Sequence, residues 1–129
     1  MSKILVVSLL LATMATLAWG QKPSDDRTAE HWASMCRTIS EVSVKADGNL
    51  RIPATFDAGQ CWGAFEALIV MSSLADNGKP LLRICPPSPS STYQWISVFV
   101  EYVKNNPDQK QDHFAFVAIA GLQQAFPCK

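Results

Sequence analysis

The chain begins with a segment typical of a cleavable export signal, and four cysteines follow it. This combination constrains the fold more than any other feature. Met1–Lys3 is short and positively charged, Ile4–Ala18 is largely apolar, and Ala18-Trp19-Gly20 has the small-x-small pattern of a cleavage site. The apolar run is shorter than the roughly 20 residues that a transmembrane helix needs, which favours a signal over an uncleaved anchor. We therefore expect residues 1–20 to be removed and the mature chain to start at Gln21.

The cysteines themselves are Cys36, Cys61, Cys85 and Cys128. An even number of cysteines in a small exported domain predicts disulfide bonds, each typically worth about 2–4 kcal/mol. A zinc site is the alternative, but no two of these cysteines have the close spacing of a zinc knuckle. We expect two disulfides, no metal ion and no cofactor.

Length and charge narrow the class of partner. Residues 21–129 are long enough for one domain. The full chain carries 11 Lys and Arg and 11 Asp and Glu, so its formal net charge is zero. Nucleic-acid binding needs a cationic surface, and this balance therefore argues against a nucleic-acid partner.

Apolar residues recur at helical spacing in four segments of the mature chain. We expect helices at about Thr28–Ser43, at Asp57–Asp76 and at Asp112–Ala125. A further helix should start after Ser91 and must stop before Pro107, because the residue before a proline is disfavoured in the helical region.

Local signals mark the ends of these helices. Ser91 with Gln94 three residues later predicts a capping box, and Asp57 with Gln60 predicts a similar start for the second helix. Asn77-Gly78 is typical of a helix C-terminus and predicts the end of that second helix.

Four helices joined by short loops favour an all-α fold, a small disulfide-stapled antiparallel four-helix bundle. In such a bundle the end of the fourth helix returns to the start of the third, which favours a Cys85–Cys128 bond and leaves Cys36 with Cys61. Four cysteines allow three connectivities, so the pairing stays open. Gly63 lies inside the apolar second helix, where we expect another backbone to approach closely.

The sequence contains no recognisable catalytic constellation. His31 and His113 lie at predicted helix starts among polar residues, which is typical of solvated histidines. Glu66 and Glu101 lie within helices, and we interpret both as members of solvated faces. An enzyme is therefore the least favoured class of function for this chain.

Several short motifs resemble one known family. They are Gln60-Cys61-Trp62-Gly63-Ala64-Phe65, Arg83-Ile84-Cys85-Pro86-Pro87, Val100-Glu101-Tyr102-Val103, Asn106-Pro107 and Ala125-Phe126-Pro127-Cys128. With this cysteine order, the mature chain resembles the Tai-like immunity proteins of bacterial type VI secretion. The resemblance implies a small helical protein of the bacterial periplasm, often dimeric, that binds a secreted peptidoglycan amidase and blocks its active-site groove.

A polar loop between the third and fourth helices is the candidate partner-binding element. Proline restricts this loop, and a rigid projecting element suits the blocking of a cleft. The candidate residues are Asn105, Asn106, Asp108, Gln109 and Lys110. The alternative is that the segment is an ordinary solvated turn.

A small periplasmic stress chaperone, which exposes apolar surface at low pH, is the alternative function. That mechanism needs a dense set of titrating groups. Charged residues make up only 17% of this chain, and it has two histidines. The immunity or inhibitor hypothesis is therefore preferred.

Overall fold

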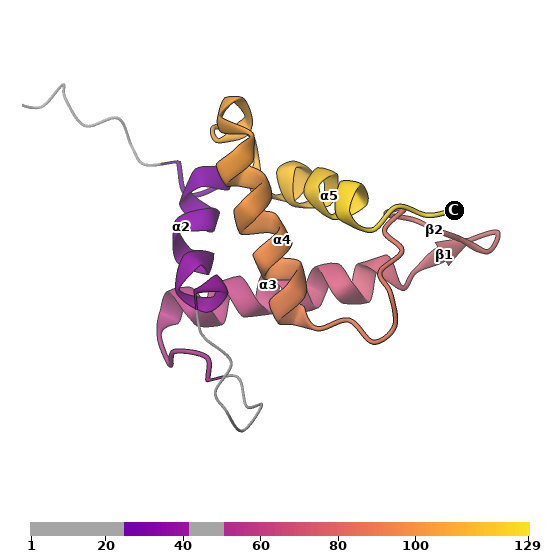
Figure 1. Ribbon diagram of the computed structural model, residues 1–129, viewed down its shortest axis with the longest axis horizontal. Coiled ribbons are helices and arrows are strands. Elements are labelled where there is room, and N and C mark those ends of the chain that lie inside the picture. The colour runs from indigo at the N-terminus through magenta and orange to yellow at the C-terminus, as the bar shows by residue number, and fades with distance from the viewer. Residues whose placement is uncertain (1–24, 42–50) are drawn as a thin grey trace, which may run out of the picture.

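The computed structural model describes residues 25–41 and 51–129. The expected signal peptide, residues 1–20, lies outside the described residues, as does the predicted end of the first helix at Ser43. Four helices dominate the described part (Figure 1): α2 (Ala29–Ser40), α3 (Phe56–Ser72), α4 (Thr92–Asn105) and α5 (Phe114–Ala125). Together with two disulfides they confirm a small, disulfide-stapled all-α bundle.

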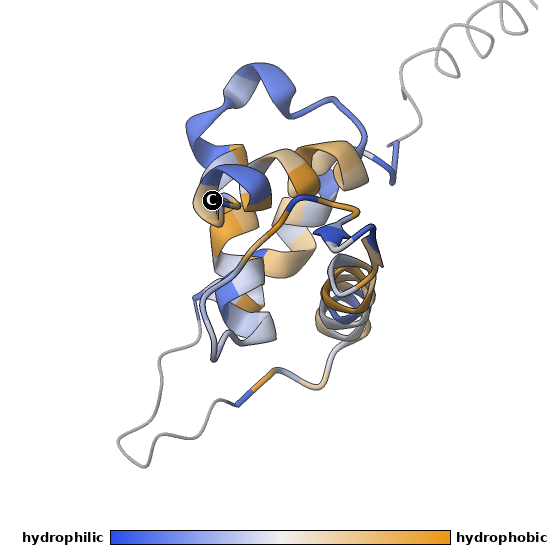
Figure 2. Cartoon of the chain, turned by 90° about the vertical axis from the view of Figure 1, so that its right-hand side faces the viewer, coloured by the Kyte–Doolittle hydropathy of each residue, from blue (hydrophilic) through white to orange (hydrophobic). Residues whose placement is uncertain are grey.

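The helices are arranged around α4, which packs against α2, α3 and α5. Helices α2 and α4 are antiparallel neighbours, and Tyr93 near the start of α4 donates a hydrogen bond to the carbonyl of Ser40 at the end of α2. Helix α3 runs across this pair in Figure 1 and is seen along its own axis in Figure 2. None of the described helices is long and apolar enough to span a membrane.

The core is built around the aromatic ring of Phe114. The ring of Trp32 stacks on it at a centroid distance of 4.2 Å. The rings of Phe99 and Phe65 meet it edge-on at 5.3 and 5.9 Å. Aromatic pairs favour such stacked and edge-to-face geometries, and these contacts join α2, α3, α4 and α5 in one cluster.

The helix starts largely follow the sequence signals. The capping box of Ser91 and Gln94 is present at α4, as predicted. Helix α3, however, is capped by Thr55, whose hydroxyl accepts a hydrogen bond from the backbone N–H of Ala58. Thr55 has extended backbone geometry and the helix begins at Phe56, so Asp57 lies within the first turn. The predicted cap at Asp57 is wrong, although a carboxylate there still stabilises the positive end of the helix dipole.

The end of α3 also differs from the prediction. The helix stops at Ser72, and a small hairpin follows, formed by β1 (Ala75–Asp76) and β2 (Lys79–Pro80). Asn77 and Gly78 both have positive φ values, 49° and 77°. Two successive residues with positive φ are typical of a two-residue hairpin turn. The Asn-Gly pair is therefore a hairpin turn and not a helix terminus.

Both disulfides join the pairs that chain topology favours. Cys36–Cys61 links α2 to α3, and both residues are fully buried in the core. Cys85–Cys128 links the segment before α4 to the segment after α5. The backbone N–H of Cys85 also donates to the carbonyl of Phe126 at 2.8 Å, so this second link is both covalent and hydrogen-bonded.

The close approach expected at Gly63 does not occur within the described residues. Gly63 is exposed on α3, and no atom lies within 4 Å of the position where a Cβ would stand. The tight contact is at Gly121 in α5 instead, where a Cβ would lie 2.8 Å from Cγ of Tyr102. Only glycine allows the Tyr102 ring of α4 to lie this close to α5.

Candidate partner-binding site

The candidate loop, residues 105–111, connects α4 to α5 and includes the 3₁₀ helix η1 (Pro107–Gln109). We call it the η1 loop. It forms one end of the molecule, at the top of Figure 1, and is strongly hydrophilic in Figure 2. The loop is thus a polar projection beside the start of α2.

Main-chain hydrogen bonds fix the shape and position of the η1 loop. The carbonyl of Asn106 accepts from the N–H of Gln109 at 3.1 Å, within the loop. The carbonyl of Lys110 accepts from the N–H of Glu30 at 2.9 Å, which attaches the loop to α2. Both bonds join backbone atoms of this chain, so the conformation of the loop does not depend on contacts with another protein.

Two of the predicted binding residues, Asn106 and Gln109, form hydrogen bonds that hold the loop in shape, and we call them the frame residues. The Nδ2 group of Asn106 donates to the carbonyl of Tyr102 at 2.8 Å. The hydroxyl of Tyr102 donates to Oε1 of Gln109 at 3.2 Å. Asn106 and Gln109 are both half-buried, so their side chains serve the loop first.

The side chains of the other three candidates differ in their exposure to solvent. Lys110 is half-buried, and its Nζ lies 4.0 Å from a carboxylate oxygen of Glu30. Asn105 is exposed and donates to Glu101 at 3.0 Å. Asp108 is exposed and forms no hydrogen bond or ion pair with any residue that the structure describes. The structure therefore brings all five candidates together but leaves Asn105 and Asp108 best placed for a partner.

Sequence reasoning missed Glu30, which holds the loop from a distant part of the chain. Its carboxylate accepts a hydrogen bond from Nε2 of Gln111 at 2.8 Å and also faces Lys110. In the sequence, an acidic residue in the first turn of a helix indicates only a favourable dipole interaction. Nothing local to Glu30 signals its contact with the η1 loop.

The other polar groups form small local networks. His113 caps α5, and its Nδ1 accepts from the N–H of Ala115 at 3.3 Å. Glu66 is exposed, as expected, and accepts a hydrogen bond from the hydroxyl of Thr92.

The carboxyl group of Asp25 accepts hydrogen bonds from Arg27. The bond from the backbone N–H of Arg27, followed by the bond from its side chain, lowers the pKa of Asp25. Within 25–41 and 51–129, no three His, Cys, Asp or Glu side chains form a group that could hold a metal ion.

The fold and the loop together define a small, disulfide-bonded helical protein that presents a preorganised polar projection. A family model of Rap1a immunity proteins matches residues 28–128. The match covers most of the chain, and the protein therefore belongs to the Rap1a immunity protein family, which is associated with effectors of type VI secretion.

The family match confirms the resemblance at the level of immunity proteins. The narrower Tai-like assignment stays a prediction. Neither a curated protein nor a solved structure shows significant similarity to the chain.

Proposed function

We propose that this protein is a non-catalytic inhibitor that binds a secreted peptidoglycan amidase and occupies its active-site groove with the η1 loop. The observation that carries the proposal is the preformed loop on a member of an immunity protein family. Exposed Asn105 and Asp108 would make the polar contacts, while Asn106 and Gln109 hold the loop in shape.

Preorganisation is the physical reason why such a loop suits inhibition. Ordering a flexible segment on binding lowers affinity, because the lost conformational freedom opposes association. Here Pro107, the main-chain bonds to α2 and the Tyr102 contacts fix the loop in advance. More of the contact energy then remains as affinity.

The proposed location is the bacterial periplasm, after removal of residues 1–20. Disulfides form and persist in oxidising compartments, and both pairs of cysteines are bonded here. A peptidoglycan amidase acts in the same compartment, so the inhibitor and its target would meet there.

The test is binding to a purified amidase effector by isothermal titration calorimetry. Replacing Asn105 and Asp108 together with alanine should weaken binding at least tenfold, about 1.4 kcal/mol. The folded state should be retained, because both side chains are exposed. Asp57→Ala is the control, since it removes an exposed carboxylate from the start of α3 instead.

The frame residues need a different expectation. Gln109→Ala should reduce both binding and the stability of the fold, the latter by about 0.5–1.5 kcal/mol, because the hydroxyl of Tyr102 loses its hydrogen-bond partner. Asn106→Ala should have a smaller effect on stability, because the carbonyl of Tyr102 still accepts from the backbone N–H of Asn106. They cannot separate contact from folding. Unchanged affinity in the Asn105 and Asp108 double variant would remove the loop from the interface.

The resemblance also predicts a homodimer, which we retain as part of the proposal. Light scattering coupled to size-exclusion chromatography would measure the mass of the mature protein in solution. A monomer at all concentrations would exclude the dimer without affecting the inhibitor hypothesis.

A further inference from the structure

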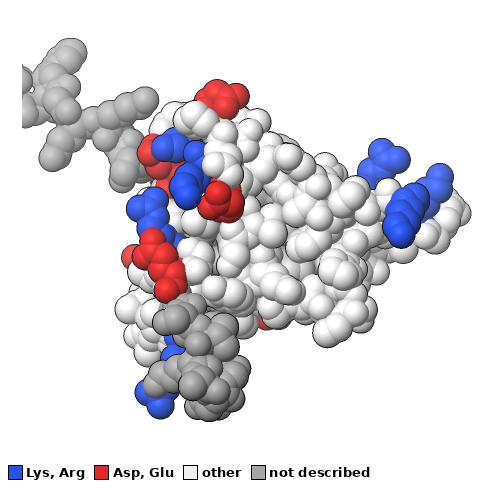
Figure 3. All heavy atoms as spheres, viewed as in Figure 1, with Lys and Arg blue, Asp and Glu red and all other residues white. Residues whose placement is uncertain are grey.

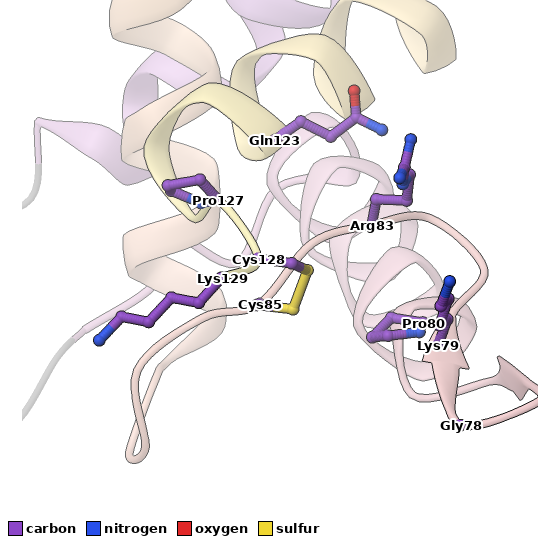
Figure 4. A pocket seen from close by; sticks show the side chains of 9 residues that line it. All are labelled: Gly78, Lys79, Pro80, Arg83, Cys85, Gln123, Pro127, Cys128 and Lys129. Atoms are coloured by element: carbon purple, nitrogen blue, oxygen red, sulfur yellow. A yellow bond between two sulfur atoms is a disulfide. The ribbon is translucent and has the colours of Figure 1, made fainter.

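The end of the molecule that carries the β1–β2 hairpin, at the right of Figure 1, has a surface that the η1 loop hypothesis does not use. There the β1–β2 hairpin, the segment to Cys85 and the end of the chain surround an open pocket of about 760 Å³. Lys79, Arg83 and Lys129 line it together with Gln123 (Figure 4). We call this end, with the last turn of α3, the hairpin surface.

Charges are segregated between the two ends of the protein. The ion pairs of the described residues are Arg27–Asp25, Lys104–Glu101 and Lys110–Glu30. All of them lie on α2, α4, the η1 loop or the segment before α2. On the face drawn in Figure 3, acidic and basic groups are interspersed at the α2 end, basic groups lie at the hairpin end, and few charged groups lie between them.

Local acids do little to balance the cations of the hairpin surface. From Leu74 to Ser90, and again from Phe114 to Lys129, the single acidic side chain is Asp76. Asp76 pairs with Lys79 in the strand register, and its carboxylate accepts from Nδ2 of Asn77 at 3.1 Å. Arg83 forms no ion pair with any residue that the structure describes.

Backbone geometry fixes where Arg83 lies. Its φ is 51°, a value uncommon for a residue with a side chain, and its N–H donates to the carbonyl of Pro80 at 3.0 Å. Gln123 supports the same turn by donating to the carbonyl of Leu82 at 2.8 Å. In Figure 4 the side chains of Lys79 and Arg83 extend to the same side, whereas Lys129 extends away from them.

Exposed apolar side chains lie on the last turns of α3 and on the hairpin segment that carries the two cations. Val70, Leu74 and Leu81 are 63%, 52% and 57% exposed, and Met71 is 47% exposed. The N–H of Leu81 donates to the carbonyl of Leu74 at 2.9 Å, which joins the hairpin to the end of α3. Apolar residues beside charged ones match the composition of protein interfaces, which have an apolar centre and a polar rim.

We infer that the hairpin surface is a second docking site, for a protein partner whose apolar patch is bordered by carboxylates. The inference rests on the proposed function, in which the partner is the inhibited hydrolase. A simple polyanion would need only Lys79 and Arg83, so the apolar residues favour a folded protein. A symmetric contact with a second copy would bring like cations together, which disfavours self-association through this surface.

Charges at the edge of an interface act mainly on the rate of association. The hairpin surface should therefore speed encounter with the acidic partner, and this effect should fall as salt increases. The apolar residues act after encounter, when they leave water, and should govern dissociation.

The experiment compares association rates with the purified amidase effector by surface plasmon resonance at low and high salt. Lys79→Glu with Arg83→Glu should slow association about tenfold at low salt and weaken the salt dependence. The control, Arg37→Glu with Arg51→Glu, makes the same change in net charge on other exposed residues and should leave the rate close to wild type. Leu74→Ala with Leu81→Ala should speed dissociation about tenfold.

The outcomes separate the two proposals. Normal binding of wild type, with unchanged association of the Lys79 and Arg83 variant, overturns the docking site alone. An amidase that does not bind wild-type protein overturns the proposed function and the docking site together. A dimer of the wild type that becomes monomeric in the Leu74 and Leu81 variant identifies a second copy as the occupant and also overturns the inference.

Discussion

Tyr102 and Gly121 contribute to the support of the η1 loop. Tyr102 donates to Gln109 and accepts from Asn106, and its ring lies against Gly121 of α5. The absence of a side chain at position 121 lets the ring take this place. A helix packing contact thus controls the loop that we propose as the binding element.

Replacing Gly121 with alanine should destabilise the protein by about 1–3 kcal/mol, because the new Cβ would overlap the Tyr102 ring. Urea unfolding measures the loss. If the proposed function holds, the same variant should also bind the proposed amidase partner more weakly, since displacement of the ring disturbs the bond to Gln109.

Gly63→Ala provides the matched control. No atom lies within 4 Å of the added Cβ, and alanine is favoured over glycine inside a helix by about 1 kcal/mol. We expect higher stability from the same chemical change. A stability loss at Gly63, or none at Gly121, would contradict this account of the two positions.

At the scale of elements, the cap of α4 makes a measurable contribution. Ser91→Ala removes the hydroxyl that accepts from the backbone N–H of Gln94 and should cost about 1 kcal/mol of stability. Ser88→Ala, in the exposed segment before the helix, should be close to neutral. Thermal unfolding followed by circular dichroism would compare them, and equal melting temperatures would argue against the cap.

Helix positions could be predicted from the sequence because apolar spacing and caps are local. The end of α3 could not, because Asn-Gly serves both helix ends and hairpin turns. The choice between them depends on the pairing of Ala75 with Pro80, which local propensity does not encode. For the same reason the sequence placed Asn106 and Gln109 in the candidate site without showing that Tyr102 binds them.

At the scale of the whole molecule, the two disulfides differ in access to solvent. Cys36 and Cys61 are fully buried, whereas Cys85 is half-buried and Cys128 is exposed. Thiol exchange requires the attacking thiolate to reach a sulfur atom. Mild reductant should therefore open Cys85–Cys128 first.

Alkylation followed by peptide mass spectrometry would follow this order. Carbamidomethyl groups should be found on Cys85 and Cys128 while the other pair is still intact, and untreated protein should take up none. Labelling of Cys36 or Cys61 first would contradict the expectation. The sequence favoured this pairing without fixing it, because a short connection makes α4 and α5 neighbours and brings the end of α5 back to the segment before α4.

The main-chain bonds between the η1 loop and α2 have a consequence for how such a protein can change over time. Peptide groups are common to every sequence. The side chains at exposed positions such as 105 and 108 can therefore change without loss of the main-chain hydrogen bonds that hold the loop. New specificities could then arise by exchanging surface groups alone. Proteins with the same fold would in this way come to bind different effectors.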